Sequence, residues 1–205
     1  MIILEDRTVI VNAEKEMLEA TRDRETAKAL EKQSLALYEI AIRDPLTGLD
    51  TRLYMKDAVA ALLWSHDHHE IPEVSMAIFD MDYFKKVNDT HGHKNGELIH
   101  REVAGIILRQ SQGTEIPIRF GGGEFLIFMS HDGDMAVSLA ERVRKEIESR
   151  RFDFGDAVIQ ITISSGVAAH RKNETLDDFI HRADQLLYKA KKNGRKQSLF
   201  ERRDR

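Results

Sequence analysis

The chain has 205 residues, 41% of them hydrophobic and 32% charged, and its formal net charge is −4. That length suits one buried core with an extension and is short for two ordinary domains. The acidic balance gives no basic field for nucleic acid, no apolar run is long enough to span a membrane, and the lack of cysteine excludes disulfides and thiolate metal sites. We therefore expect a cytoplasmic protein with no nucleic-acid partner and no membrane insertion.

A long helix is predicted near the N-terminus. Residues 13–43 contain no Gly or Pro and are rich in Ala, Glu, Lys, Leu and Arg, which favour helices. Small or apolar residues recur there at alternating steps of three and four, namely Ala27, Leu30, Ser34, Leu37 and Ala41. This spacing suits either a coiled coil that joins two copies of the chain or a helix packed on its own domain. The first twelve residues carry no pattern that predicts a structure.

The sequence DPLTGL should end this helix. Pro45 disfavours helical geometry at Asp44, and Gly48 marks a turn. We therefore expect a helical or coiled-coil extension over residues 1–42 and a folded domain over residues 43–205.

Helices and strands alternate in the predicted domain. Helices are predicted at about residues 51–65, 95–110, 134–150 and 176–192. Strands are predicted at residues 74–80, 116–120, 125–129, 157–169 and 198–201. Because helices alternate with strands and two strands meet at a tight glycine turn, the fold class is α/β or α+β with a mixed sheet.

Two aspartates follow the apolar strand in the sequence FDMD. Asp80 and Asp82 project to one face if the strand continues through them, and their oxygens gather at its carboxyl end if it stops there. Hard cations such as Mg²⁺ prefer such oxygen ligands. The alternative is a pair of solvated acids at the end of a strand.

Two further motifs could contact phosphate. The glycine triplet in RFGGGEF allows positive φ angles and close approach to the backbone, which suits a tight hairpin and also a phosphate cradle. Lys191 and Arg195 lie four residues apart at the end of a predicted helix, beside one another on one face, where they could reach a polyphosphate or simply be solvated.

A histidine cluster follows the first helix of the predicted domain. His66, His68 and His69 occur in the sequence SHDHHE and could hold a transition metal. Their spacing fits no single face of a helix or strand, so an exposed polar loop is the simpler interpretation.

Five blocks of sequence, in order, resemble the diguanylate cyclase (GGDEF) family from about Asp44 to the C-terminus. They are DPLTGL, FDMDYFKKVNDTHGHKNGE, RFGGGEF, ITISSGVA and ADQLLYKAKKNGRK. The resemblance implies a five-stranded sheet wrapped by helices, like the palm of nucleotide cyclases and polymerases. It also implies the reaction, in which two domains each hold one GTP and join them into cyclic di-GMP with release of pyrophosphate.

The resemblance assigns roles to individual residues. Asp80, with the backbone carbonyl of Met81, would bind Mg²⁺ or Mn²⁺ at the triphosphate. The phosphates would be held by Lys85, Lys191 and Arg195. Asn88 and Glu97 would bind the guanine edge. Position 97 is usually Asp in the family, and Glu97 keeps an acceptor on a side chain one methylene longer.

The signature turn departs from the family pattern. The family has Gly-Gly-acid-acid-Phe, whereas residues 121–125 read Gly-Gly-Gly-Glu-Phe. In the family, the acidic residue that corresponds to position 123 binds a metal ion. Gly123 therefore lacks a negative charge where cations must be held. Glu124 is retained but, as the next residue on an extended turn, should point to the other face. With Asp80, residues Gly122, Gly123 and Glu124 form the predicted catalytic set.

The product-inhibition motif of the family, Arg-x-x-Asp, is also missing. Its place is taken by residues 112–115, which read QGTE. Feedback inhibition through that site is therefore not expected.

The resulting hypothesis is a GGDEF-family signalling domain that binds GTP and acts as a homodimer through its N-terminal helix, with turnover impaired by Gly123. A natural degenerate domain and an engineered inactive form would both have this sequence. One alternative is an active diguanylate cyclase that replaces the lost ligand by Glu124 or water. A second is a non-catalytic interaction module. The intact Asp80, Lys85 and Lys191 argue against that module.

Overall fold

The computed structural model describes residues 2–111, 113–155 and 158–201, with the backbone alone for residues 2–10. The chain divides into two compact units, of which the first ends at Ala41 and the second begins at Ile42.

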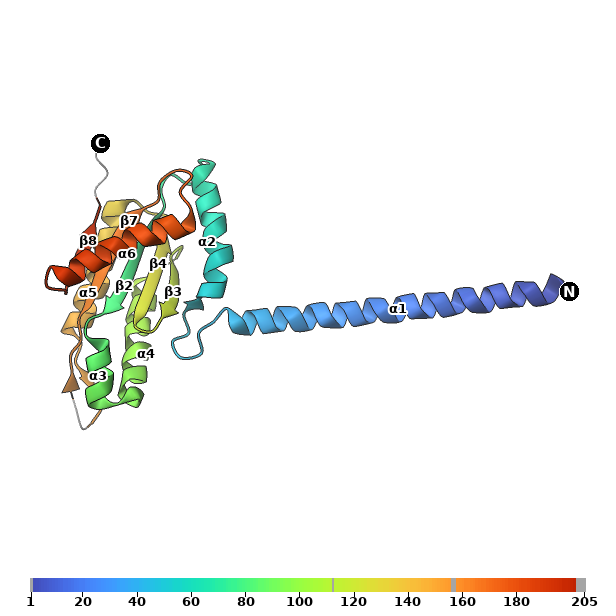
Figure 1. The fold of residues 1–205 in the computed structure, drawn as a ribbon, viewed down its shortest axis with the longest axis horizontal. Coiled ribbons are helices and arrows are strands. Elements are labelled where there is room, and N and C mark those ends of the chain that lie inside the picture. The colour runs from blue at the N-terminus through green and yellow to red at the C-terminus, as the bar shows by residue number, and fades with distance from the viewer. Residues whose placement is uncertain (1, 112, 156–157, 202–205) are drawn as a thin grey trace. The chain divides into compact units, whose positions relative to one another are not determined.

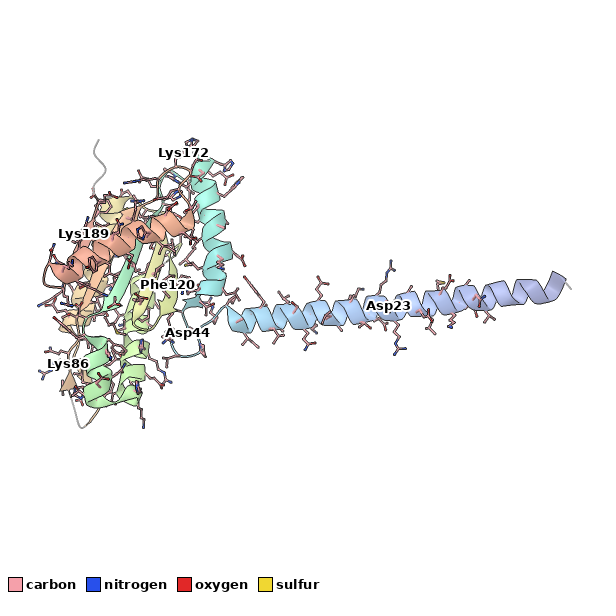
Figure 2. The ribbon with its side chains drawn as sticks, viewed as in Figure 1. Asp23, Asp44, Lys86, Phe120, Lys172 and Lys189 are labelled. Atoms are coloured by element: carbon pink, nitrogen blue, oxygen red, sulfur yellow. The ribbon has the colours of Figure 1, made fainter. Side chains whose placement is uncertain are left out.

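The first unit is a single helix, α1 (Ile2–Ala41). It begins well before residue 13, where the predicted helix started, because no Gly or Pro occurs before Pro45. Residues 11–37 are exposed, among them Leu30 and Leu37 of the predicted seam. Side chains such as that of Asp23 project from the helix along its length (Figure 2). Neither α1 nor any other helix in the described residues combines the length and apolar character needed to cross a membrane.

The second unit is built on a six-stranded sheet with the order β1-β3-β4-β2-β7-β8 (Figure 1). Its strands are β1 (Asp50–Thr51), β2 (Ser75–Met81), β3 (Ile116–Gly121), β4 (Glu124–Met129), β7 (Ile163–Ala169) and β8 (Ser198–Phe200). The central strands pair antiparallel, and β1 and β8 join the edges in parallel. A separate pair is formed by β5 (Phe152–Asp153) and β6 (Val158–Ile159). The predicted mixed sheet is confirmed, and the two-residue β1 makes it six-stranded instead of five-stranded.

Helices cover both faces of the sheet (Figure 1). They are α2 (Arg52–Asp67), α3 (Phe84–His91), α4 (His93–Gln110), α5 (Gly133–Ser149) and α6 (Leu176–Lys192). One buried cluster packs α4 and α5 against the sheet, through residues such as Val103 and Val143. The other cluster packs α2 and α6 against it through residues such as Val59 and Phe179. The expected sheet wrapped by helices is therefore confirmed.

The side chains of β2 alternate between these two clusters. Phe79 and Met81 belong to the cluster of α4 and α5, whereas Met76 and Ile78 belong to the cluster of α2 and α6. Asp80 therefore points to the side of α6, at the end of the strand where its carboxylate escapes burial in the core.

Two segments differ from their predictions. The predicted strand over residues 157–169 is split in two, because β6 ends at Ile159 and pairs with β5 in a separate sheet, whereas β7 begins at Ile163; residue 157 lies outside the described residues. The sequence predicts no helix between residues 81 and 94, whereas the structure has α3 there. Phe84 and Val87 are its only strongly apolar residues, which left the helical pattern too short to recognise.

Candidate functional site

A cavity of about 620 Å³ lies at the end of the sheet where β2 stops. It is bordered by the β3–β4 turn, by α3 and by the end of α6. The predicted site residues that line it are Asp80, Met81, Lys85, Asn88, Gly122, Gly123, Lys191 and Arg195. Glu97 and Glu124 do not line it. The volume lies within the range of about 300–1,000 Å³ typical of small-molecule sites.

Another cavity, of about 810 Å³, lies between α2, β3 and the start of α6. Its lining includes Arg52, which lies over the ring of Phe120 with the guanidinium carbon 3.8 Å from the ring centroid. The lining contains one carboxylate, that of Asp177, and none of the predicted site residues. The smaller cavity is therefore the better candidate, despite its smaller volume.

Asp80 and Lys191 form an ion pair at this cavity. Lys191 Nζ lies 3.0 Å from Asp80 Oδ1, and both side chains are only partly exposed. Burial raises the pKa of Asp80, the bond and charge of Lys191 lower it, and the net direction is upward. Burial disfavours the charge of this carboxylate, and Lys191 compensates for that only in part. Such a carboxylate is well suited to bind a further cation.

Glu124 lies directly opposite Asp80 in the antiparallel pairing of β2 and β4. Opposite residues in such a pair share one face, so both acids lie on the side of α6. Burial raises the pKa of the Glu124 carboxyl, and the charge of Asp80 raises it further. The Asp80 carboxylate lies close enough to raise the pKa of Glu124, so this end of the sheet concentrates negative charge.

Gly123 differs from the two glycines before it. Gly121 and Gly122 have positive φ angles of 157° and 46°, whereas Gly123 does not need one. A Cβ atom built on Gly123 would lie 3.2 Å from Met81 Cε, the flexible end of a side chain, and 3.7 Å from Phe84 Cδ1. It would therefore point to the side of Met81, away from Glu124. The backbone at position 123 can accept a side chain, so its conformation does not require glycine.

The side chain of Asn88 lies in a space that a glycine on the next helix leaves open. Its Oδ1 atom is buried and has no hydrogen-bond partner within the described residues. A Cβ atom at Gly96 would lie 1.9 Å from that oxygen, so only glycine leaves room for the amide. An orphaned buried acceptor suits a ligand that brings its own N–H donor. The next residue, Glu97, is exposed on α4, so its contact with a base stays a prediction.

A family model described as "Diguanylate cyclase, GGDEF domain" matches residues 41–197. The chain belongs to this family. It is 32% identical over 157 residues to Diguanylate cyclase A of Treponema denticola, a match that covers 73% of this chain and 42% of that relative. The chain spans less than half the length of the curated relatives that it matches first.

Solved structures of GGDEF proteins share the fold. One is the diguanylate cyclase SiaD in complex with its activator SiaC from Pseudomonas aeruginosa, with a TM-score of 0.76, 31% identity and coverage of 97% of this chain and 76% of that chain. Another is the coiled coil and GGDEF domain of DgcB from Caulobacter crescentus in complex with c-di-GMP. Its TM-score is 0.79 at 28% identity, and it covers 90% of this chain and 99% of that chain.

Two of the predicted site residues of this GGDEF chain have other surroundings than expected. Arg195 does not share a helix face with Lys191, because α6 ends at Lys192 and Arg195 has a left-handed φ of 64°. It reaches the cavity by donating to Tyr83 Oη at 3.0 Å, with its guanidinium 4.3 Å from the centre of that ring. Asp82 is buried and makes hydrogen bonds to the chain around the start of β7. Its carboxylate accepts hydrogen bonds from Ser164 Oγ at 2.8 Å and Thr162 Oγ1 at 2.6 Å.

The side chain of His100 contacts the GGDEF signature turn, a role that no sequence motif predicted. Its Nε2 lies 2.7 Å from the carbonyl of Gly122, and its Nδ1 lies 3.0 Å from the carbonyl of Gly96. Burial lowers the pKa of His100 and outweighs these two carbonyls, which raise it. The neutral ring donates through one nitrogen only, and the shorter contact assigns that hydrogen bond to Gly122.

Asp44, the first residue of the DPLTGL motif, is tied to the strand that carries the signature. Arg119 Nη1 donates to both of its carboxylate oxygens, at 2.9 and 2.8 Å. Burial alone would raise the pKa of Asp44, but hydrogen bonds from Thr47 and Arg119 lower it. The motif therefore fixes the start of the domain to β3, outside the cavity.

Proposed function

We propose that this chain is a GGDEF domain that binds GTP in the cavity at the end of β2 and converts it to cyclic di-GMP only slowly. The observation that carries the proposal is the contrast between Asp80 and position 123. Asp80 is in place and paired with Lys191 at 3.0 Å, whereas Gly123, on the neighbouring turn, offers no carboxylate. Binding and turnover are therefore affected differently.

The triphosphate is assigned to the cationic side of the cavity. Lys85, Lys191 and Arg195 line it, and they come from α3, α6 and the segment after α6. Side chains from separate elements can contact different phosphates at once, which a single charged helix face cannot do. On binding, Lys191 would exchange its bond to Asp80 for one to a phosphate oxygen.

The donor atoms present fit a hard divalent cation, for which we propose Mg²⁺ or Mn²⁺. Asp80 would supply a carboxylate oxygen and Met81 its backbone carbonyl, which are the ligand types such ions prefer. When bound, the cation would neutralise the triphosphate and polarise the α-phosphate. Gly123 leaves this set one carboxylate short of the family pattern.

The base is assigned to the pocket beside α3 and α4. The orphaned Oδ1 atom of Asn88 can accept an N–H of guanine. Glu97, exposed on α4, would accept the remaining N–H groups of that edge. Adenine presents an unprotonated nitrogen there and would leave the carboxylate unpaired, so we expect a preference for GTP over ATP.

Cyclisation needs two such domains, and we propose that α1 brings them together. Leu30 and Leu37 are exposed apolar residues on the predicted seam. Support comes from the similar structure of DgcB, which is described as a coiled coil and GGDEF domain. Pairing through a short linker raises the effective concentration of two domains to about the millimolar range.

The alternative is an active cyclase, and two observations favour it. Glu124 lies opposite Asp80 on the same face of the sheet and could move its carboxylate toward a shared cation. The relatives are also named as diguanylate cyclases. The rate of turnover therefore decides between the two readings, while GTP binding is common to both.

Calorimetry with GTP and Mg²⁺ tests the binding half of the proposal. We expect saturable binding to the native chain, weaker binding of ATP, and an affinity for GTP reduced about tenfold by Lys191→Ala, as for loss of one charge-assisted hydrogen bond. Lys192→Ala is the matched control, since the Lys192 ammonium lies over the Tyr188 ring and does not line the cavity. No binding of GTP, or equal losses in both variants, would overturn the assignment of the cavity.

A further inference from the structure

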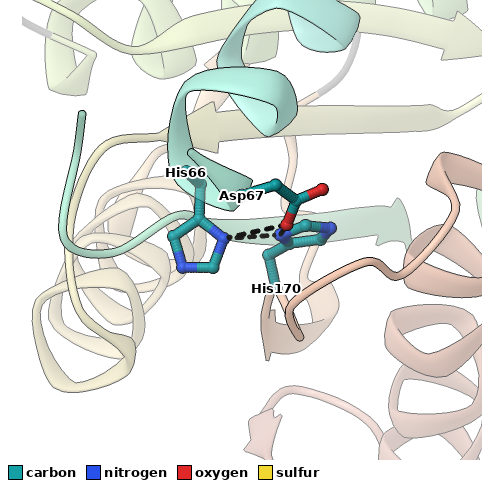
Figure 3. Close-up of side chains that lie close together, drawn as sticks. All are labelled: His66, Asp67 and His170. Atoms are coloured by element: carbon teal, nitrogen blue, oxygen red, sulfur yellow. Dashed lines mark hydrogen bonds and ion pairs between the residues drawn. The ribbon is translucent and has the colours of Figure 1, made fainter. Parts of the chain in front are cut away.

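Three side chains that commonly bind metals meet at the opposite end of the sheet from Asp80. His66 and Asp67 are the last two residues of α2, and His170 directly follows β7. Because Ala169 pairs with Ser75 while Ile163 pairs with Met81, this group lies a full strand length away from the nucleotide cavity. Figure 3 shows the three side chains pointing toward one another.

Their ligand atoms are close enough to share one ion. His66 Nδ1 lies 2.9 Å from His170 Nδ1, a hydrogen bond between the two rings that a bound ion would replace, with His66 carrying its proton on Nε2 instead. Asp67 Oδ1 lies 3.8 Å from His66 Nδ1 and 4.0 Å from His170 Nδ1. Nitrogen and oxygen ligands at about 2.1 Å from one ion lie roughly 3–4 Å from each other. The observed spacing therefore needs only small side-chain shifts to surround an ion.

The protonation of His170 prepares it as a ligand. Its Nε2 lies 3.0 Å from the carbonyl of Glu174, which can only accept, so Nε2 carries the proton of the neutral ring. Nδ1 then presents its lone pair toward His66 and Asp67. A ligating histidine whose other nitrogen donates to a carbonyl is the usual arrangement at protein metal sites. His170 is fully buried, which keeps this orientation fixed.

Asp67 and the approach to the site are also defined. The backbone N–H of Asn173 donates to Asp67 Oδ1 at 2.9 Å, which holds the carboxylate in place. A cavity of about 310 Å³, lined in part by His66 and His69, opens beside the group and can admit water to complete the coordination. Lys172, beside the end of α2, has its Nζ 3.1 Å from His69 Nε2, so His69 belongs to the rim (Figure 2).

We propose that His66, Asp67 and His170 bind one divalent transition-metal ion, with Zn²⁺ the best suited to two imidazoles and one carboxylate. The bound ion clamps the end of α2 to the segment between β7 and α6, two parts of the chain that are 104 positions apart. Of the histidines in SHDHHE, only His66 takes part. His68 instead directs Nδ1 to the carbonyl of Trp64 at 2.8 Å.

Equilibrium dialysis of the metal-stripped chain against Zn²⁺, with elemental analysis, tests the site. We expect one Zn²⁺ per chain and a rise in the unfolding temperature with Zn²⁺ concentration. His66→Ala should weaken binding at least about tenfold, as loss of metal-site partners does. His69→Ala is the matched control and should bind as the native chain does.

Asp67→Asn provides a second variant in case His66→Ala fails to fold. The amide oxygen of Asn can still accept the N–H of Asn173, so the local fold is kept while the negative charge is lost. Its weaker Zn²⁺ binding, with the far-ultraviolet circular dichroism spectrum unchanged, would support the proposal. Absence of stoichiometric Zn²⁺, or a loss that follows His69→Ala instead of the cluster variants, would overturn it and assign any bound metal to exposed histidines.

Discussion

The side chain of His100 helps to hold the signature turn in position. Its ring lies between the carbonyls of Gly96 and Gly122, so it connects α4 to the turn that borders the candidate cavity. The two carbonyls favour the protonated ring, but burial disfavours its charge more strongly, so the pKa of His100 is lowered.

The depressed pKa of His100 makes stability depend on pH. An unfolded histidine titrates near 6.5, above the folded value, so below that pH the unfolded chain binds more protons. We predict that the free energy of unfolding falls as pH decreases from 7.5 to 5.5, and that His100→Leu flattens this dependence. Urea denaturation at each pH measures it, with His68→Ala as the exposed control. An unchanged slope in His100→Leu would assign the pH dependence to other groups.

The chemical type of most site residues could be predicted from the sequence, but their partners could not. Asp80, Lys85 and Asn88 lie in or soon after an apolar strand in a recognisable block and line one cavity, and their roles there stay predictions. Tyr83 and Asp82 were not assigned their observed contacts, since these depend on residues about 80 to 112 positions away. Such pairings are set by the tertiary fold, which periodicity alone does not encode.

Helix α4 contains two glycines, one closely packed and one with room for a side chain. A Cβ at Gly96 would lie 1.9 Å from Asn88 Oδ1, whereas one at Gly105 would approach only the flexible end of Arg109, at 3.5 Å. Alanine is the better helix former by about 1 kcal/mol, so helix propensity alone predicts a gain at both positions.

Packing should reverse that gain at one position. We predict that Gly96→Ala destabilises the chain by about 1–3 kcal/mol, the usual effect of overpacking, and weakens GTP binding because Asn88 is displaced. Gly105→Ala should be neutral or stabilise it by up to about 1 kcal/mol. Chemical denaturation and calorimetry measure the two effects. A stable Gly96→Ala chain that binds GTP normally would show that Asn88 is not held by this contact.

Helix α1 presents a seam whose pairing can be tested directly. The seam residues Leu30 and Leu37 are exposed and alternate with small residues, so we predict a weak dimer of about micromolar affinity. Replacing both leucines by Glu should shift sedimentation profiles to monomer. Leu18→Glu with Leu35→Glu is the matched control, since both residues are exposed on α1 outside the seam. An unchanged dimer population in the seam variant would contradict pairing through this stripe.

Long elements were easier to predict than short ones. The helix at residues 176–192 was predicted with the observed ends, because Thr175 caps its start and Asn193 and Gly194 end it. The two-residue β1 and the eight-residue α3 were missed because each has too short a pattern to be recognised. The start of α1 was missed for another reason. Its first residues lack a clear amphipathic face although nothing prevents a helix there.

At the scale of the whole molecule, the sheet separates two sites with different chemistry. The proposed nucleotide cavity lies where β2 ends, and the histidine–aspartate group lies where it begins. Variants at one end should therefore leave the other unchanged, since distant sites with no shared contacts behave additively. The proposed metal site and the proposed GTP site can thus fail or succeed independently.

The central claim is that Gly123 limits turnover in a domain that otherwise retains its GTP site. The most direct measurement is the rate of cyclic di-GMP formation from GTP and Mg²⁺, followed by chromatography, for the native chain and for Gly123→Glu. The tightest neighbour of the new Cβ atom is the flexible end of Met81, and Phe84 lies at ordinary contact distance, so the fold should accept the side chain. We predict that the native chain is at least about a hundredfold slower, as expected for a missing charge-stabilising group. Equal rates for the two proteins would contradict the claim.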